Sequence, residues 1–157
     1  MTFTVTSTGF TEGSALPDAQ VYARGNRSPQ LSWSGAPEGT RSFAITCFDP
    51  DAPTGSGFWH WTVANIPADV TALAEGASSA GLPTVAVEGR TDFGPPGFGG
   101  AAPPQGHGPH RYIFTVFAVD AERLDITPDD SGAIFGFNLH FHTLARASIT
   151  GIYENRG

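Results

Sequence analysis

Two short segments of the chain gather most of the side chains that could do chemistry. The first reads DPDAP at residues 49–53 and continues, after a short loop, as FWHW at residues 58–61. The second reads GHGPHRY at residues 106–112. Together they offer carboxylates, imidazoles and a phenol, the groups that bind small polar ligands, hold metals or transfer protons. These segments are therefore the candidate functional site.

The elements that position these groups are expected to be short β-strands separated by loops that contain glycine and proline. The alternation of apolar and β-forming residues predicts strands at 3–8, 30–33, 41–48, 58–66, 111–119 and 148–153. The third, fourth and fifth of these are apolar on both faces, which is typical of strands in the middle of a covered sheet. A helix is expected over 133–147, with Asp129, Asp130 and Ser131 as candidate N-caps. The pattern predicts a mainly β sandwich, a single domain over residues 1–157, with a helix near the C-terminus.

The composition argues against several classes of partner. The chain of 157 residues carries 15 acidic and eight basic residues, all eight of them arginine, for a net charge of −7. The arginines form no cluster of the kind that a nucleic acid requires. No apolar run approaches the roughly 18 residues of a membrane span, and the lone Cys47 fits a reducing compartment. We therefore expect a cytoplasmic protein with no nucleic-acid partner and no stable membrane insertion.

The two segments resemble the signatures of a known family. DPDAPTGSGFWHW at residues 49–61 and FGGAAPPQGHGPHRY at residues 98–112 are similar to the two signature regions of the phosphatidylethanolamine-binding protein family. GNRSPQLSWSGAPEGTRSFAI at residues 25–45 and HTLARASITGIY at residues 142–153 resemble its bacterial, Raf-kinase-inhibitor-like branch. The similarity extends from residue 3 to residue 153, which is nearly the whole chain.

The resemblance implies two antiparallel sheets with short peripheral helices, and a small pocket that binds an anion. Carried onto matching positions, the pocket residues are Asp49, Asp51, Pro53, His60, Pro104, His110 and Tyr112, with the backbone of Gly99 and Gly100. The ligand would be phosphate or a phospho-head-group such as phosphoethanolamine. The resemblance also implies modulation of a partner kinase or protease, and bacterial relatives suggest a homodimer. No cofactor and no resident metal are expected.

The residue types of this pocket suit an oxyanion. Histidine N–H groups and a phenolic hydroxyl donate hydrogen bonds to phosphate oxygens, and glycines let backbone N–H groups approach closely as a donor nest. One aspartate can accept a histidine N–H and hold its tautomer, while the other can accept backbone N–H groups of its loop or the ammonium of a zwitterionic head group. The pocket then needs the aspartates as well as the hydrogen-bond donors, although the carboxylates repel a phosphate.

The leading hypothesis is a non-enzymatic binding protein, and the alternative is a metal-dependent or hydrolytic enzyme that uses the Asp/His cluster. Histidine and aspartate pairs that could ligate a metal are His107/His110, His140/His142 and Asp49/Asp51. A hydrolase would have to use the paired carboxylates and histidine, because the chain has no Gly-x-Ser-x-Gly elbow. Individually, Cys47 fits a core position, His107 fits an exposed rim, and Arg111 fits a structural role that holds loop carboxylates or carbonyls.

Overall fold

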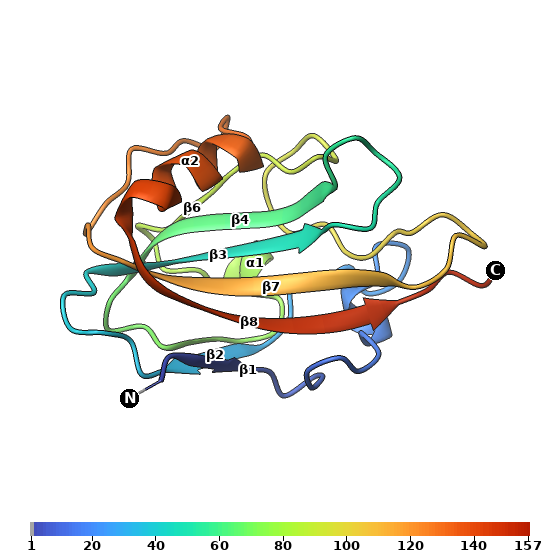
Figure 1. Ribbon diagram of the computed structural model, residues 1–157, viewed down its shortest axis with the longest axis horizontal. Helices are drawn as coiled ribbons and strands as arrows, with labels where there is room; N and C mark the ends of the chain where they lie inside the picture. The colour runs from blue at the N-terminus through green and yellow to red at the C-terminus, as the bar shows by residue number, and fades with distance from the viewer. Residues whose placement is uncertain (1) are drawn as a thin grey trace.

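The computed structural model describes residues 2–157 and arranges its strands in two antiparallel sheets (Figure 1). The larger sheet has the strand order β6-β4-β3-β7-β8 and the smaller one the order β1-β2-β5. The bounds are β1 Thr4–Thr6, β2 Leu31–Ser34, β3 Ser42–Asp49, β4 Phe58–Pro67, β5 Ala72–Leu73, β6 Val87–Glu88, β7 His110–Val119 and β8 Thr143–Tyr153. The two-sheet architecture expected from the sequence is confirmed.

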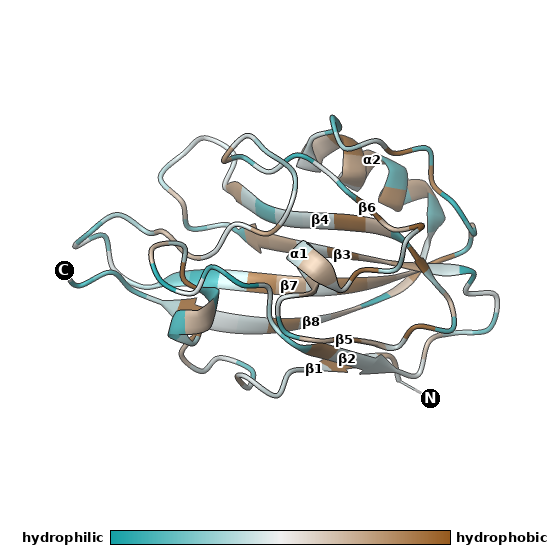
Figure 2. Cartoon of the chain, turned by 180° about the vertical axis from the view of Figure 1, so that it is seen from behind, coloured by the Kyte–Doolittle hydropathy of each residue, from teal (hydrophilic) through white to brown (hydrophobic). Residues whose placement is uncertain are grey.

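The three strands that are apolar on both faces, β3, β4 and β7, occupy the middle of the five-stranded sheet. Side chains on one face, such as Ile45, Val63 and Phe114, pack in a core between the two sheets with Trp33 of β2. Alternate side chains on the other face, such as Phe117, pack in a second core. Apolar residues thus run through the centre of the sheet (Figure 2), because both of its faces are covered.

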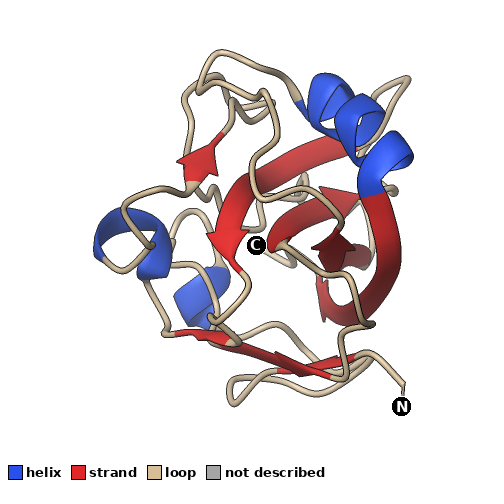
Figure 3. Cartoon of the chain, turned by 90° about the vertical axis from the view of Figure 1, so that its left-hand side faces the viewer, coloured by secondary structure: helices blue, strands red, loops and turns tan. Residues whose placement is uncertain are grey.

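The second core lies under helix α2, Gly132–His142. Phe135 and Leu139 point into this core, and Ser131 caps the helix by accepting a hydrogen bond from the Ile134 N–H. The expected extension of this helix to residue 147 is wrong. The chain passes from α2 directly into β8 at Thr143 (Figure 3), because residues 143–153 pair along the whole length of β7.

The connection from residue 67 to residue 88 contains short elements that the sequence pattern missed. They are β5, the four-residue helix α1 at Ala77–Ala80, and β6; a 3-10 turn at Asp18–Gln20 was missed as well. Elements of two to four residues are too short to show a hydrophobic period, so only their tertiary pairing defines them. No helix in the described range, residues 2–157, is long and apolar enough to cross a membrane.

Three central strands bring their chemistry to one end of the larger sheet. Strand β3 ends at Asp49, β4 begins at Phe58 opposite Asp49, and β7 begins at His110. Antiparallel pairing places the end of one strand beside the start of the next. The two sequence segments of the candidate site therefore meet at this edge.

Candidate functional site

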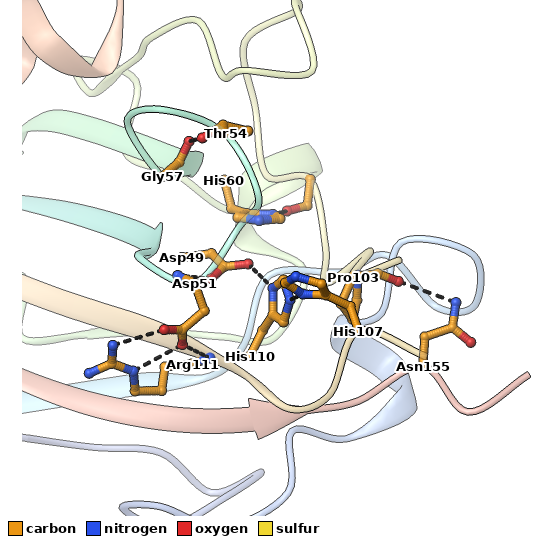
Figure 4. A network of polar contacts seen from close by, with 11 residues as sticks. Asp49, Asp51, Thr54, Gly57, His60, Pro103, His107, His110, Arg111 and Asn155 are labelled. Carbon is orange, nitrogen blue, oxygen red and sulfur yellow. Dashed lines mark hydrogen bonds and ion pairs between the residues drawn. The ribbon is translucent and has the colours of Figure 1, made fainter. Parts of the chain in front are cut away.

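A cavity of about 210 Å³ opens at this end of the sheet. Strands β3, β4 and β7 supply its polar residues other than Thr54, together with Phe58, and the loops that follow β3 and precede β7 supply Thr54 and the other apolar residues. The lining residues are Asp49, Ala52, Pro53, Thr54, Phe58, His60, Phe93, Ala102, Pro103, Pro104, His110 and Tyr112. Figure 4 shows the carboxylate and imidazole side chains around it. This volume lies below the range of about 300–1,000 Å³ that is usual for drug-sized ligands, so the cavity suits a small group.

The cavity brings together six of the nine residues that the resemblance indicated. Asp49, Pro53, His60, Pro104, His110 and Tyr112 all line it. The other three, Asp51, Gly99 and Gly100, lie beside it without lining it.

The buried carboxylate of Asp49 accepts a hydrogen bond on each oxygen. Its Oδ2 lies 2.6 Å from Nδ1 of His110, and its Oδ1 accepts the Asp51 N–H at 2.7 Å. Both side chains of the Asp49–His110 pair are almost completely buried. Because an ionised carboxylate only accepts, Nδ1 of His110 carries the proton. The expected role of one aspartate, to hold a histidine tautomer, therefore falls to Asp49.

The second nitrogen of His110 has a partner that the sequence did not indicate. Its Nε2 lies 2.6 Å from Nδ1 of His107, whose side chain is at the exposed rim, as expected (Figure 4). Both ring nitrogens of His110 are thus occupied, one by Asp49 and one by His107. In this arrangement His110 has no free N–H for a ligand, in contrast to the expected donor role.

Asp51 turns away from the cavity and binds Arg111. Its carboxylate accepts hydrogen bonds from Nε, Nη2 and the backbone N–H of Arg111, each at 2.9 Å. Hydrogen bonds from the Arg111 side chain lower the pKa of Asp51 to about 2. The structural role expected for Arg111 is confirmed, and Asp51 acts here as its partner, locking the loop after β3 to the start of β7.

His60 is buried on β4 and lines the cavity. Its Nδ1 lies 2.8 Å from the carbonyl oxygen of Gly99. A carbonyl only accepts, so Nδ1 carries the proton and Nε2 of the neutral ring has a free lone pair. Burial lowers the pKa of His60 from its usual value of 6.5, although the charges of Asp49 and Asp92 work in the opposite direction.

The Tyr112 hydroxyl is buried and has no hydrogen-bond partner among residues 2–157. The Asp49 carboxylate and the Ala102 backbone lie near enough to influence its pKa, but neither meets the distance and angle of a hydrogen bond with it. Burial, assisted by the negative charge of Asp49, raises the pKa of Tyr112. The phenol therefore keeps its proton at neutral pH and remains a donor without an acceptor, which is rare inside proteins.

Gly99 and Gly100 hold the wall of the cavity instead of forming a donor nest. The Gly99 N–H donates to the carbonyl of His60 at 2.9 Å, and the Gly100 N–H donates to Oδ1 of Asn26 at 2.7 Å. Both N–H groups are therefore used within the fold, which corrects their expected role as donors to an anion. A Cβ at Gly100 would lie 2.4 Å from the carbonyl oxygen of Gln20, so glycine is required for this close approach.

The sequence indicated Pro53 and Pro104 but did not single out the aromatic part of the apolar lining. Phe58 and Phe93 contact each other and the His60 ring, with ring centroids 4.8–5.4 Å apart. Phe58 is the first residue of the FWHW motif and of β4, but Phe93 lies 33 residues after His60 in a loop with no periodic signal. Only the folded loop brings it to the site.

Two of the pairs considered for an enzyme, His107/His110 and Asp49/Asp51, lie together at the candidate site, whereas His140/His142 lies on α2 and outside the cavity lining. His142, at the end of α2, binds Asp120, and within the described range no group of three or more His, Cys, Asp or Glu side chains is placed to hold a metal. Cys47 is buried as expected, and burial raises the pKa of its thiol well above the usual value. It therefore lacks the thiolate character of a nucleophile.

The fold and this cavity define a class: β-sandwich proteins with a small, partly apolar pocket at one end of the central strands. A family model described as phosphatidylethanolamine-binding protein matches residues 6–154. The chain belongs to that family, as the motifs indicated.

Two relatives in Escherichia coli (strain K12) are about half identical to the chain. UPF0098 protein YbhB is 51% identical over 150 residues, covering 91% of this chain and 94% of that protein. UPF0098 protein YbcL is 51% identical over 160 residues, covering 97% and 87%. The crystal structure of YbcL superposes with a TM-score of 0.95 and covers 97% of this chain and 98% of that one. A homolog from Chlamydia trachomatis, CT736, superposes with a TM-score of 0.84 at 29% identity, covering 98% and 97%.

Proposed function

We propose that this protein is a non-enzymatic binding protein whose cavity takes a small oxyanion, either phosphate or a phospho-head-group such as phosphoethanolamine. The buried, unpartnered hydroxyl of Tyr112 carries this proposal. An unsatisfied buried donor costs about 1–3 kcal/mol, and a ligand oxygen in the cavity would recover that cost.

The rest of the lining supports a small ligand held by few polar groups. Pro53, Phe58, Phe93 and Pro104 form apolar walls, and His60 adds a polar edge. Small-molecule sites commonly combine apolar walls with a small number of placed hydrogen-bonding groups. The walls exclude water and strengthen each hydrogen bond that the ligand makes.

A titration followed by NMR tests the proposed function. Phosphate or phosphoethanolamine should shift the ring signals of His60 and Tyr112 in a saturable way. His142, which lies on α2 and binds Asp120, provides an internal control whose signals should stay in place. Equal shifts at all histidines, or none at all, would contradict the proposal.

One observation favours the alternative, a hydrolytic enzyme. Asp49 and His110 form a carboxylate–imidazole pair of the kind that serves as a general base. However, His107 covers the nitrogen of His110 that would take up the proton. A screen of esters, phosphate esters and peptides, with the Asp49→Ala variant as the control, separates the two functions. Turnover by the unmodified protein that is lost in the variant would favour the enzyme.

Three further expectations remain, two from the family resemblance and the third, the location, from the composition. Modulation of a kinase or protease, assembly into a homodimer and a cytoplasmic location stay predictions. Sedimentation of the purified protein at several concentrations tests the dimer. Co-purification from cells with a kinase or protease that is displaced by phosphoethanolamine would support a regulated partner.

A further inference from the structure

The donors and acceptors of the cavity determine which form of an oxyanion it can hold. His60 presents an acceptor, because its Nδ1 proton is committed to the Gly99 carbonyl and its Nε2 has no partner among the described residues. Tyr112 presents a donor, because its buried hydroxyl is unpartnered. Both rings line the cavity and contact each other, with centroids 5.2 Å apart. The polar part of the site therefore offers one acceptor beside one donor.

The groups that face His60 keep it an acceptor. Asp49 faces it from β3, Asp92 from the loop that follows β6, and His110 and Tyr112 from β7. The oxygens of Asp49 already accept two N–H groups, and Asp92 accepts the Trp59 N–H at 2.8 Å. Burial outweighs the influence of these carboxylates on His60 and disfavours its imidazolium form.

No other side chain in the cavity compensates for the charge of a dianion. The lining contains no lysine or arginine. Both nitrogens of His110 are occupied, and the Thr54 hydroxyl donates to the Gly57 carbonyl at 2.6 Å. A fully ionised oxyanion would therefore bring its oxygens against the His60 lone pair and the Asp49 carboxylate, with a single donor in return. Such an arrangement leaves a buried acceptor unsatisfied, which is costly.

We propose, on the basis of the anion-binding function above, that the cavity selects a protonated oxyanion: the monoanion of phosphate or of a phosphate monoester. The acid hydroxyl of the ligand donates to Nε2 of His60, and an ionised oxygen of the same group accepts from the Tyr112 hydroxyl. The ligand thus brings the proton that the protein lacks. Its single charge also reduces the repulsion by Asp49.

Methyl phosphate and methyl sulfate make a matched pair of probes. Both monoanions are of closely similar shape and charge, but only methyl phosphate carries an acid proton. At pH 5 we expect methyl phosphate to bind at least about fivefold more tightly, because methyl sulfate leaves His60 Nε2 without a donor. Between pH 5 and pH 8 the affinity for methyl phosphate should fall about 100-fold, since a second pKa near 6 leaves about 1% monoanion at pH 8.

Calorimetry of the full chain with these two probes distinguishes the outcomes. Equal affinity for both probes, or stronger binding of methyl phosphate at pH 8 than at pH 5, would overturn the selection of a protonated ligand and leave the anion site standing. Binding of neither probe would overturn the anion site itself, and the selection with it. Sulfate, a dianion without a proton at both pH values, should bind no more tightly than methyl sulfate.

Two conservative variants locate the binding in the cavity. Tyr112→Phe removes the donor. Since this hydroxyl has no partner among residues 2–157, the variant should fold normally and lose at least about fivefold in affinity for methyl phosphate. Tyr153→Phe, on the neighbouring strand β8 and outside the cavity lining, is the matched control and should bind as the unmodified protein does. Unchanged affinity in Tyr112→Phe would overturn the proposed hydrogen bond.

Discussion

The carboxylate of Asp49 and the imidazole of His110 meet at 2.6 Å inside the protein, with only 3% and 2% of the two side chains exposed. The two residues are 61 positions apart in the chain but lie on neighbouring strands, β3 and β7. Such a pair joins the two halves of the candidate site, and its loss affects both the fold and the cavity.

Replacing Asp49 should therefore destabilise the protein strongly. Asp49→Ala leaves the His110 Nδ1–H and the Asp51 N–H without an acceptor, at about 1–3 kcal/mol for each buried donor. Asp49→Asn keeps one oxygen that can accept, so we expect a smaller loss. Urea unfolding measures both variants. Equal stability of Asp49→Ala and the unmodified protein would show that neither hydrogen bond contributes.

The Asp51–Arg111 pair should make stability depend on pH in the acid range. Hydrogen bonds from Arg111 lower the pKa of Asp51 from 3.8 to about 2 in the folded state. The folded protein then binds fewer protons than the unfolded chain, so the contribution is complete above about pH 4 and is lost as the pH falls towards 2. Solvent screening keeps it small, because both side chains are partly exposed.

Unfolding of Asp51→Asn at pH 6 and at pH 2 measures this effect. The variant should be less stable than the unmodified protein at pH 6, and the difference should shrink at pH 2. Asp69→Asn, at an exposed aspartate, controls for the loss of one negative charge. A difference that persists unchanged at pH 2 would mean that the ion pair is not its cause.

His60 should lower the stability of the protein as the solution becomes mildly acidic. Its folded pKa lies below 6.5 because of burial, so the folded state resists protonation that the unfolded chain accepts. The stability linked to His60 is therefore complete above about pH 6.5 and decreases as the pH falls through the folded pKa. His60→Gln cannot be protonated and should lose less stability between pH 7.5 and pH 5. His140→Gln, at an exposed histidine on α2, is the control; the hypothesis fails if both variants respond alike.

A methyl group at Gly100 should disturb the cavity wall. A Cβ there would lie 2.4 Å from the Gln20 carbonyl oxygen and 2.7 Å from the Tyr22 nitrogen, so backbone has to move. We expect Gly100→Ala to cost about 1–3 kcal/mol of unfolding free energy, as overpacking does. Gly136→Ala, at an exposed position of α2 with open space around it, should instead stabilise by about 0.5–1 kcal/mol. Thermal melts of both variants should shift in opposite directions, and a shared direction would refute the packing argument.

The sequence by itself determined the longer strands, because only these are long enough to show a pattern of apolar residues. Strands β3, β4 and β7 are apolar on both faces, and this property alone indicates a central place in a covered sheet. The family motifs also indicated Asp49, His60, His110 and Tyr112. These polar side chains are recognisable in the sequence because they lie at the junctions between apolar strands and loops rich in glycine and proline. The end of α2 at His142 was not predictable from periodicity, because the pairing of residues 143–153 with β7 decides where the helix stops and β8 begins.

Only the tertiary structure decided what each polar group can offer a ligand. Hydrogen bonds across the fold commit both nitrogens of His110, turn His60 into an acceptor and leave the Tyr112 hydroxyl free. The same long-range contacts use the N–H groups of Gly99 and Gly100 inside the fold. A residue type states which hydrogen bonds are available to it, but partners far away in the chain determine which of them remain for a ligand, because each proton and each lone pair is used only once.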